Sequence, residues 1–302
     1  MKGRKQIGMA MERLRKLDSL ESGKEWSTGV ELKYAPVYSL VLPTYNPGKE
    51  IEHTLWRIKD FLTKTETRWE AIFVCDGCTD GTPERIQNNI GNFIGQIRVI
   101  QYSPNQGKGY AVKQGLLSSR GKYRIFTDCD LAYRLEDVLL MSEWLEEQVD
   151  SKRDENALAV VIASREHPQS EVTMPVHLMS YFFRRQFQSR IFGKLARWLL
   201  PIAQLDTQAG LKGLTASAVE KVLPILECHG FGFDCELLTA CAYYQIPVLE
   251  MPVRVHYANA TTTTSVQSIR KMLRELVQIR QRWQKQPQQL DRRERGNQAK
   301  AA

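Results

Sequence analysis

The stretch KYRIFTDCD (residues 122–130) joins an apolar run to two aspartates, Asp128 and Asp130, that stand one residue apart. A short apolar run bounded by polar residues is typical of a buried strand. Two like charges at the end of such a strand have two explanations. They form either a solvated surface turn or a metal site that holds a phosphorylated substrate. The segments on both sides decide between these interpretations.

Strand and helix patterns alternate along the chain on both sides of this stretch. The predicted strands cover residues 37–43, 69–77, 97–103, 122–130 and 157–165. The predicted helices between them cover residues 51–64, 82–90, 107–119 and 135–148. This alternation predicts an α/β domain with a mostly parallel central sheet flanked by helices.

Polar motifs follow the predicted strands at the points where they end. They are Thr44-Tyr45-Asn46, Asp76-Gly77, Asp128-Cys129-Asp130 and Ser164-Arg165. The carboxyl ends of parallel strands meet at one edge of a sheet, where α/β proteins bind their ligands. A solvated turn explains any one motif, but four at the same edge favour a site.

The size and charge of the chain indicate one large domain with an anionic partner. The chain has 302 residues, 42% of them hydrophobic, and a formal net charge of +8. From Gln267 onward there are ten Lys/Arg and three Asp/Glu residues. We expect a charged leader (1–35), one domain (36–265) and a basic helical tail (266–302). The sequence does not indicate an oligomeric state.

The cysteines and the hydropathy pattern point to a reducing compartment. The six cysteines follow no disulfide framework, and no apolar signal peptide opens the chain. No window reaches the about 18 consecutive apolar residues that a membrane-spanning helix needs. We therefore expect a cytoplasmic protein that is neither secreted nor anchored by a transmembrane helix.

The residues at the sheet edge favour a nucleotide-diphosphate-sugar donor. Neither the Walker A loop nor the Gly-x-Gly-x-x-Gly dinucleotide motif is present. Asp128 and Asp130 can offer oxygen ligands to Mg²⁺ or Mn²⁺, and a diphosphate can complete the coordination. Asp76 can accept from a base or ribose, and Lys108 can add positive charge near the phosphates or Asp128.

An ordered set of motifs carries a resemblance to a known family. They read LVLPTYN, VCDGCTDGT, NQGKGYAVKQGLLSSRGKYRIFTDCD, LDTQAGLKG and FDCELL. Over residues 36–260 the chain resembles family 2 inverting glycosyltransferases with the GT-A fold. It looks most like the branch with dolichyl-phosphate β-glucosyltransferases and polyprenyl-phosphate glycosyltransferases. This resemblance implies transfer of a hexose, glucose from UDP-glucose, to a polyprenyl phosphate at the cytoplasmic membrane face.

The resemblance also implies roles for residues at the donor side. The donor-binding set is Pro43, Thr44, Tyr45, Asn46, Asp76, Lys108 and Asp128. Asp130 would bind the metal, and Asp128 would contact either the ribose or the metal. His256 follows a predicted strand and could supply a third metal ligand or a diphosphate contact.

The acceptor side leaves two chemistries open. A hydroxyl acceptor needs a general base, for which Asp234 and Glu236 are candidates, whereas a phosphate acceptor is already anionic. Asp206 belongs to the same catalytic region through the DTQAGLKG signature. Gln208 and Lys212 of that signature would bind the acceptor, with Lys212 countering phosphate charge.

Two further features bear on the acceptor. The amphipathic segment 178–200 mixes aromatic residues and arginines, a pattern typical of a helix that lies on an anionic membrane surface. ANATTTTS (258–265) stands where the lipid-phosphate branch commonly carries a Gly-Ser-Lys-like run. A hydroxyl acceptor, on a glycolipid or a soluble molecule, is therefore the alternative. A non-catalytic nucleic-acid-binding protein is a remoter one, because it leaves the aspartate pair unexplained.

Overall fold

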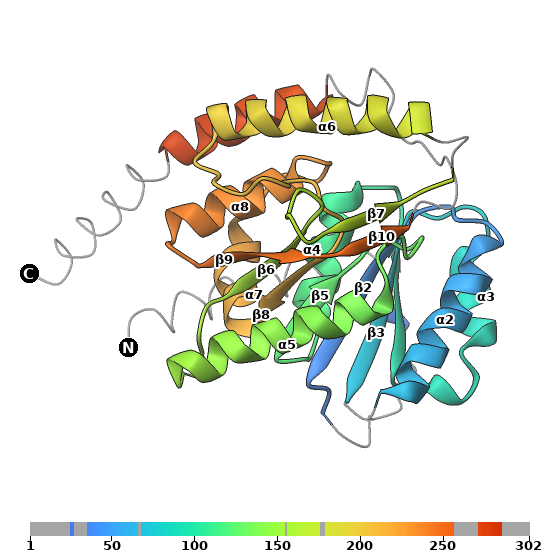
Figure 1. Cartoon of the computed structure of the whole chain (residues 1–302). Coiled ribbons are helices and arrows are strands. Elements are labelled where there is room, and N and C mark those ends of the chain that lie inside the picture. The colour runs from blue at the N-terminus through green and yellow to red at the C-terminus, as the bar shows by residue number, and fades with distance from the viewer. Residues whose placement is uncertain are drawn as a thin grey trace, which may run out of the picture.

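The computed structural model describes residues 25–26, 35–65, 68–154, 156–175, 179–256 and 271–285. Within them, eight strands form one twisted sheet in the order β1-β4-β3-β2-β5-β8-β6-β9 (Figure 1). The strands are β1 (Glu25–Trp26), β2 (Tyr38–Thr44), β3 (Trp69–Asp76), β4 (Ile97–Tyr102), β5 (Tyr123–Phe126), β6 (Val160–Ser164), β8 (Lys212–Thr215) and β9 (Val248–Pro252).

Most neighbouring strands run parallel, as the alternating pattern predicts. The pairs β4–β3, β3–β2, β2–β5 and β6–β9 are parallel. Strand β8 runs antiparallel to both β5 and β6, and β1 pairs antiparallel with β4. The prediction of a mostly parallel sheet is confirmed. The short edge strand β1 comes from the segment expected to be only a leader.

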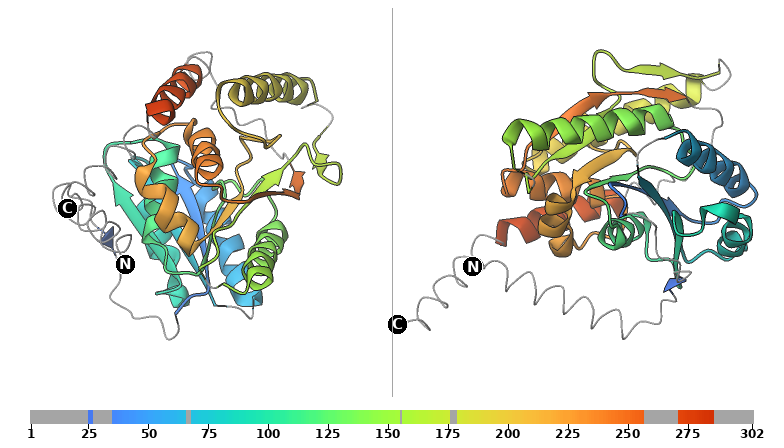
Figure 2. Two further views of the ribbon diagram at one scale, coloured as in Figure 1. Left: turned by 90° about the vertical axis from the view of Figure 1, so that its left-hand side faces the viewer. Right: turned by 90° about the horizontal axis from the view of Figure 1, so that it is seen from below.

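Helices cover both faces of the sheet because each turns an apolar side to it. On one face lie α2 (Glu50–Lys64), α3 (Thr82–Asn89) and α5 (Leu135–Lys152). On the other face lie α4 (Lys108–Ser118), α7 (Ala216–Val222) and α8 (Phe233–Tyr243) (Figure 2, left). Each face has its own core: Ile51 and Leu55 of α2 belong to the first, and Val112 and Leu116 of α4 to the second.

Two outer helices lie over the second core. One is α6 (Met179–Leu199), and the other covers residues 271–285 within the predicted basic tail (Figure 1). They meet where the Arg280 guanidinium donates to the Leu199 carbonyl oxygen at 3.2 Å. Leu276, Ile279 and Trp283 are buried in the second core, so residues 271–285 pack onto the domain.

A small parallel pair of strands stands beside the main sheet. Strand β7 (Glu171–Thr173) pairs with β10 (Arg254–His256). The stretch ANATTTTS lies outside the described residues, and so does the side chain of His256. None of the helices in the described part of the chain has the length and apolar character needed to cross a membrane.

Candidate active site

Residues at the carboxyl ends of β2 and β3 build the first wall of the site. Thr44 ends β2 and is buried, whereas Tyr45 in the following turn is exposed. Asn46 has φ 45°, and its side-chain oxygen accepts from the backbone N–H of Thr79 at 2.8 Å. Pro43, which pairs with Val74 in the sheet register, leads into this turn. The turn after β2 is therefore fastened to the loop after β3.

Asp76, the last residue of β3, organises the loop that leads to α4. Its carboxylate accepts from the backbone N–H groups of Gln106 at 2.7 Å and Gly107 at 2.9 Å, and from the Asn105 amide at 2.9 Å. Gly77 follows with φ 67°, and a Cβ there would lie 2.3 Å from the Asn105 nitrogen. Only glycine fits this turn. Asp76 thus fixes the start of α4 and, with it, Lys108.

The aspartate pair stands in a tight turn after β5. Leu131 has φ 50°, an unusual conformation for a residue with a branched side chain, and its N–H donates to the Asp128 carbonyl at 3.0 Å. The N–H of Ala132 donates to the Asp130 carboxylate at 3.0 Å. Asp128 is half-buried and Asp130 is exposed. The turn therefore presents two carboxylates at the rim of the sheet.

Asp128 is paired with Lys108 and lies close to Gly210. The Lys108 ammonium lies 2.5 Å from Oδ1 of Asp128. Burial alone would lower the pKa of Lys108, but Asp128, Asp234 and Asp130 together hold that pKa above its usual value. A Cβ at Gly210 would lie 2.1 Å from Oδ2 of Asp128, so any larger residue would displace this carboxylate. The sequence prediction did not include Gly210, although it lies within the DTQAGLKG motif.

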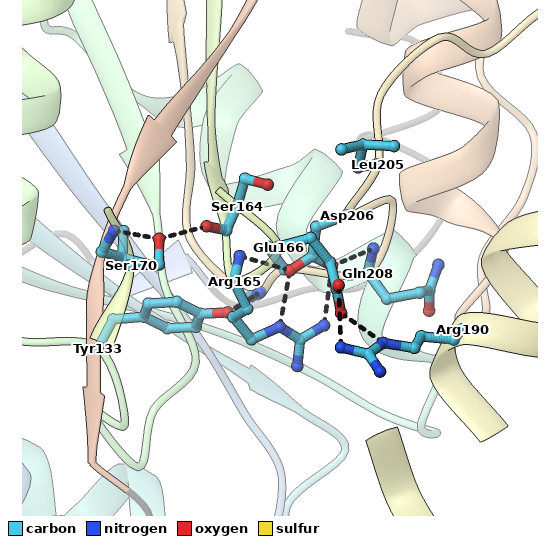
Figure 3. Close-up of polar contacts among 12 residues, drawn as sticks. Tyr133, Ser164, Arg165, Glu166, Ser170, Arg190, Leu205, Asp206 and Gln208 are labelled. Atoms are coloured by element: carbon cyan, nitrogen blue, oxygen red, sulfur yellow. Dashed lines mark hydrogen bonds and ion pairs between the residues drawn. The ribbon is translucent and has the colours of Figure 1, made fainter. Parts of the chain in front are cut away.

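Asp206 is held by an arginine that the sequence interpretation had noted only as a strand end. Arg165 donates through Nε to Oδ2 of Asp206 at 2.7 Å and through Nη2 to Oδ1 at 2.8 Å (Figure 3). The backbone N–H of Arg165 adds a contact at 3.0 Å. Burial alone would raise the pKa of Asp206, but the Arg165 guanidinium holds it below its usual range. Asp206 therefore stays ionised. Its ion pair with Arg165 connects the end of β6 to the loop that follows α6.

Lys212 and Asp234 form an ion pair beneath the site. The Lys212 side chain is 0% exposed, and its ammonium lies 2.6 Å from Oδ1 of Asp234 and 2.5 Å from the Ala209 carbonyl. Asp234 is in the first turn of α8 and is also buried. The Lys212 charge is thus met by a carboxylate inside the protein. Gln208, half-buried on the preceding loop, contacts the Cys235 sulfur at 3.6 Å.

Glu236 is bound by the loop before α8 and by the C-terminal helix, residues 271–285. One carboxylate oxygen accepts from the backbone N–H of Glu227 at 3.0 Å and of Cys228 at 2.6 Å. The other accepts from the Arg282 guanidinium and, at 3.3 Å, from the Trp283 indole. The structure therefore brings Lys108 and Asp128 together, and Lys212 and Asp234, but places Glu236 in a separate network.

Two carboxylates, Asp128 and Asp130, lie where the sequence predicts a metal site. Among the described residues, no group of three or more His, Cys, Asp or Glu side chains is arranged to hold a metal ion. The Cα of His256 pairs with Thr173 in the small sheet, while its side chain is outside the described residues. Asp128 and Asp130 are the two carboxylates in the turn after β5, and two carboxylates alone leave most positions around a divalent cation to other oxygens.

Comparison with known proteins defines the class. The model of the glycosyl transferase family 2 matches residues 39–223. The chain belongs to this family, and it is a glycosyltransferase, as its motifs predict.

Particular relatives are similar over most of the chain. Dolichyl-phosphate beta-glucosyltransferase of Saccharomyces cerevisiae is 31% identical over 251 residues, covering 80% of this chain and 73% of that protein. The Homo sapiens protein of the same name is 29% identical, covering 81% and 75%. The crystal structure of glucosyl-3-phosphoglycerate synthase from Mycobacterium tuberculosis with Mg²⁺ and UDP has a TM-score of 0.50 at 17% identity, covering 81% and 78%. The GT-A fold is thereby confirmed.

Proposed function

We propose that this glycosyltransferase moves glucose from UDP-glucose onto a polyprenyl or dolichyl phosphate. The observation that carries this proposal is the pairing of the three carboxylates of the expected catalytic set, of which Asp234 and Glu236 are the candidate bases. Asp206 is paired with Arg165, Asp234 with Lys212, and Glu236 with Arg282. All three are buried, so taking a proton from an acceptor would break a buried ion pair. A phosphate acceptor suits this arrangement, since it arrives already ionised and needs no deprotonation.

The names of the similar proteins support the same acceptor. Both relatives described above are named dolichyl-phosphate beta-glucosyltransferases, and the similarity extends over about four-fifths of this chain. The family model covers residues 39–223, which include the donor edge and the DTQAGLKG loop.

The donor would lie along the edge formed by the ends of β2, β3 and β5. The Pro43–Asn46 turn and the loop organised by Asp76 would receive the nucleotide. Asp76 would act through the backbone groups of Gln106 and Gly107, because its carboxylate already accepts from both. Lys108 would face the diphosphate from the first turn of α4, where the helix dipole adds positive potential.

Asp128 and Asp130 would hold Mg²⁺ or Mn²⁺ beside that diphosphate. Their oxygens are the type of ligand these hard cations prefer, and both lie at the rim rather than in the core. Such an ion neutralises charge on the leaving diphosphate. Lys108 pairs with Asp128 here and would supply a second positive charge to the phosphates once Asp128 turns to the ion.

The geometry gives the expected acceptor residues unequal roles. Gln208 is half-buried on the loop next to Gly210 and would contact the acceptor phosphate. Lys212 is fully buried and paired, so it would fix Asp234 instead of meeting the acceptor. The ion pair between Asp206 and Arg165 would fix the conformation of the same loop.

An exposed apolar surface on α6 and the loop after it fits a membrane-bound acceptor. Ile191 is 51% exposed, Trp198 76% and Leu205 55%, and exposed Lys194 lies on the same side of the helix. Arg190 and Arg197 are less available for lipid than the sequence suggested. Arg190 pairs with Glu166, and Arg197 donates to the Leu205 carbonyl at 3.0 Å. This α6 surface would lie in the headgroup region of a bilayer.

Donor specificity and metal dependence can be tested together. The full chain is incubated with polyprenyl phosphate vesicles and labelled UDP-glucose, UDP-galactose or GDP-mannose, with Mg²⁺, with Mn²⁺ or with excess EDTA. We expect label in the lipid fraction from UDP-glucose with either metal, and none with EDTA. Equal transfer in EDTA would contradict the metal assignment, and preference for another donor would contradict the choice of glucose.

A further inference from the structure

In the described part of the chain, the helix over residues 271–285 makes several polar side-chain contacts to one short segment, while its Arg280 reaches Leu199 on α6. Its buried face carries Leu276, Ile279 and Trp283. The polar side chains on its flank reach residues 227–236, the loop that precedes α8 and the start of that helix. A helix attached only by apolar packing would not need this concentration of polar contacts.

Glu236 is the deepest of these contacts. Its side chain is 0% exposed and accepts four hydrogen bonds, two from the loop backbone and two from Arg282 and Trp283. Arg282 also reaches Glu227 at 3.4 Å. A buried carboxylate that loses a partner is strongly destabilised, so this joint holds the loop and the helix together as one unit.

Glu275 makes a second contact between the helix over residues 271–285 and the loop before α8. Its Oε2 accepts from the backbone N–H of Gly232 at 2.8 Å. Gly232 is the residue immediately before α8, whose first turn carries Asp234. Position and direction of the start of α8 therefore depend on a side chain from the C-terminal helix.

The other side of the loop is fastened to α4. The His229 carbonyl accepts from the N–H of Tyr110 at 3.2 Å, and the Leu226 carbonyl accepts from the Lys113 ammonium at 2.7 Å. The first residue of α4 is Lys108, which pairs with Asp128. The loop thus lies between the C-terminal helix and the helix that presents Lys108 to the donor edge.

We propose that Glu275 and Arg282 are positioning residues for glycosyl transfer, holding the 226–232 loop so that Lys108 stays beside Asp128 and Asp234 stays beside Lys212. This inference rests on the proposed function, because it concerns the same site. It assigns part of the predicted basic tail to the working of the enzyme.

Three substitutions of Glu275 separate positioning from folding. Glu275→Ala removes the acceptor for the Gly232 N–H, and we expect kcat to fall about tenfold or more. Glu275→Gln keeps an oxygen at the same place, so kcat should stay within about threefold of the parent value. Glu275→Asp keeps the charge but withdraws the oxygen by one methylene, and it should lie between them. The control is Gln278→Ala, an exposed residue on the same helix that should change nothing.

Nucleoside affinity provides the readout that a general loss of folding would not reproduce. The Kd of uridine, measured by calorimetry, should stay within about twofold in all variants, because the turns after β2 and β3 would receive the nucleoside, whereas Lys108 would face only the diphosphate. Unchanged kcat in Glu275→Ala and Glu275→Asp would overturn the inference. So would a loss in Glu275→Ala that the fraction of unfolded protein accounts for, or an equal loss in Glu275→Gln. If the parent itself transfers no glucose, the proposed function fails instead.

Discussion

The carboxylates at the two ends of the site differ in their exposure to solvent. At the donor edge, Asp130 is exposed and Asp128 is half-buried in a turn at the rim. In the second half of the domain, Asp206, Asp234 and Glu236 are all buried, and each is paired with a basic side chain. Asp128 is paired too, with Lys108, but it is more exposed than the three buried carboxylates. In the proposed function the rim carboxylates would bind a cation, whereas the buried pairs would hold loops in place.

We expect the largest effect on stability from breaking the buried ion pair between Lys212 and Asp234. Lys212→Met keeps the length of the side chain but leaves Asp234 buried without its cation. We expect the free energy of unfolding, measured in urea, to fall by about 3–5 kcal/mol. Lys64→Met is the matched control because it breaks the exposed Lys64–Asp60 pair at 2.7 Å, and it should cost at most about 1 kcal/mol. Equal costs would remove the distinction between buried and exposed pairs.

At the donor edge, substitution should harm transfer and not stability. Asp130→Asn keeps the volume and removes one charged oxygen ligand, so the transfer rate should fall about a hundredfold or more, equivalent to about 3 kcal/mol. The melting temperature should stay close to that of the parent, because the side chain is exposed. Asp150→Asn, also exposed, is the control and should retain activity. A large loss of stability in Asp130→Asn would show that this carboxylate is architectural too.

The Arg165–Asp206 pair should give a signature in the pH dependence of stability. The folded pKa of Asp206 lies below the value in the unfolded chain, so its contribution is present above about pH 4 and is lost as the pH falls through the folded pKa. In Asp206→Asn that contribution is absent at every pH. Urea unfolding at pH 7 and pH 3 should show a smaller difference for the variant, by up to about 1 kcal/mol. An unchanged difference would count against the pair.

The α6 surface should give the smallest effect. Trp198→Ala removes the most exposed aromatic ring of that surface, and vesicle binding should weaken about tenfold, or about 1.4 kcal/mol. Trp56→Ala is a matched control, since Trp56 is 63% exposed and belongs to α2, a helix that lies away from α6 (Figure 1). Sedimentation with vesicles of anionic phospholipid measures both. Equal weakening by the two substitutions would indicate non-specific adsorption.

Local patterns were sufficient to predict the fold and the sheet edge at which the polar motifs lie. The alternation of strands and helices depends on the periodicity of neighbouring residues, and the polar motifs come directly after strands. The fold, the family and the transferase activity follow from these motifs and from the resemblance. Lys108 and Asp128 are 20 positions apart, but a parallel sheet brings the ends of their elements together.

The pairing of charges in the second half could not be predicted in this way. Arg165 and Asp206 are 41 residues apart, and Arg282 and Glu236 are 46 apart. Which cation meets which carboxylate is decided by the antiparallel insertion of β8 and by the packing of residues 271–285. Asp234 and Glu236 are two positions apart in α8, where side chains diverge by about 200° around the axis. One therefore turns toward Lys212 and the other toward Arg282.

The most direct test compares two acceptors that differ only in the phosphate. Vesicles containing polyprenyl phosphate, or the corresponding polyprenol, are incubated with the full chain, labelled UDP-glucose and Mg²⁺. If the acceptor is an ionised phosphate and the buried carboxylates are structural partners, label should appear on polyprenyl phosphate. No label should then appear on polyprenol. Transfer to polyprenol at a comparable rate, abolished by Asp234→Asn, would contradict that assignment, because an alcohol acceptor requires a base.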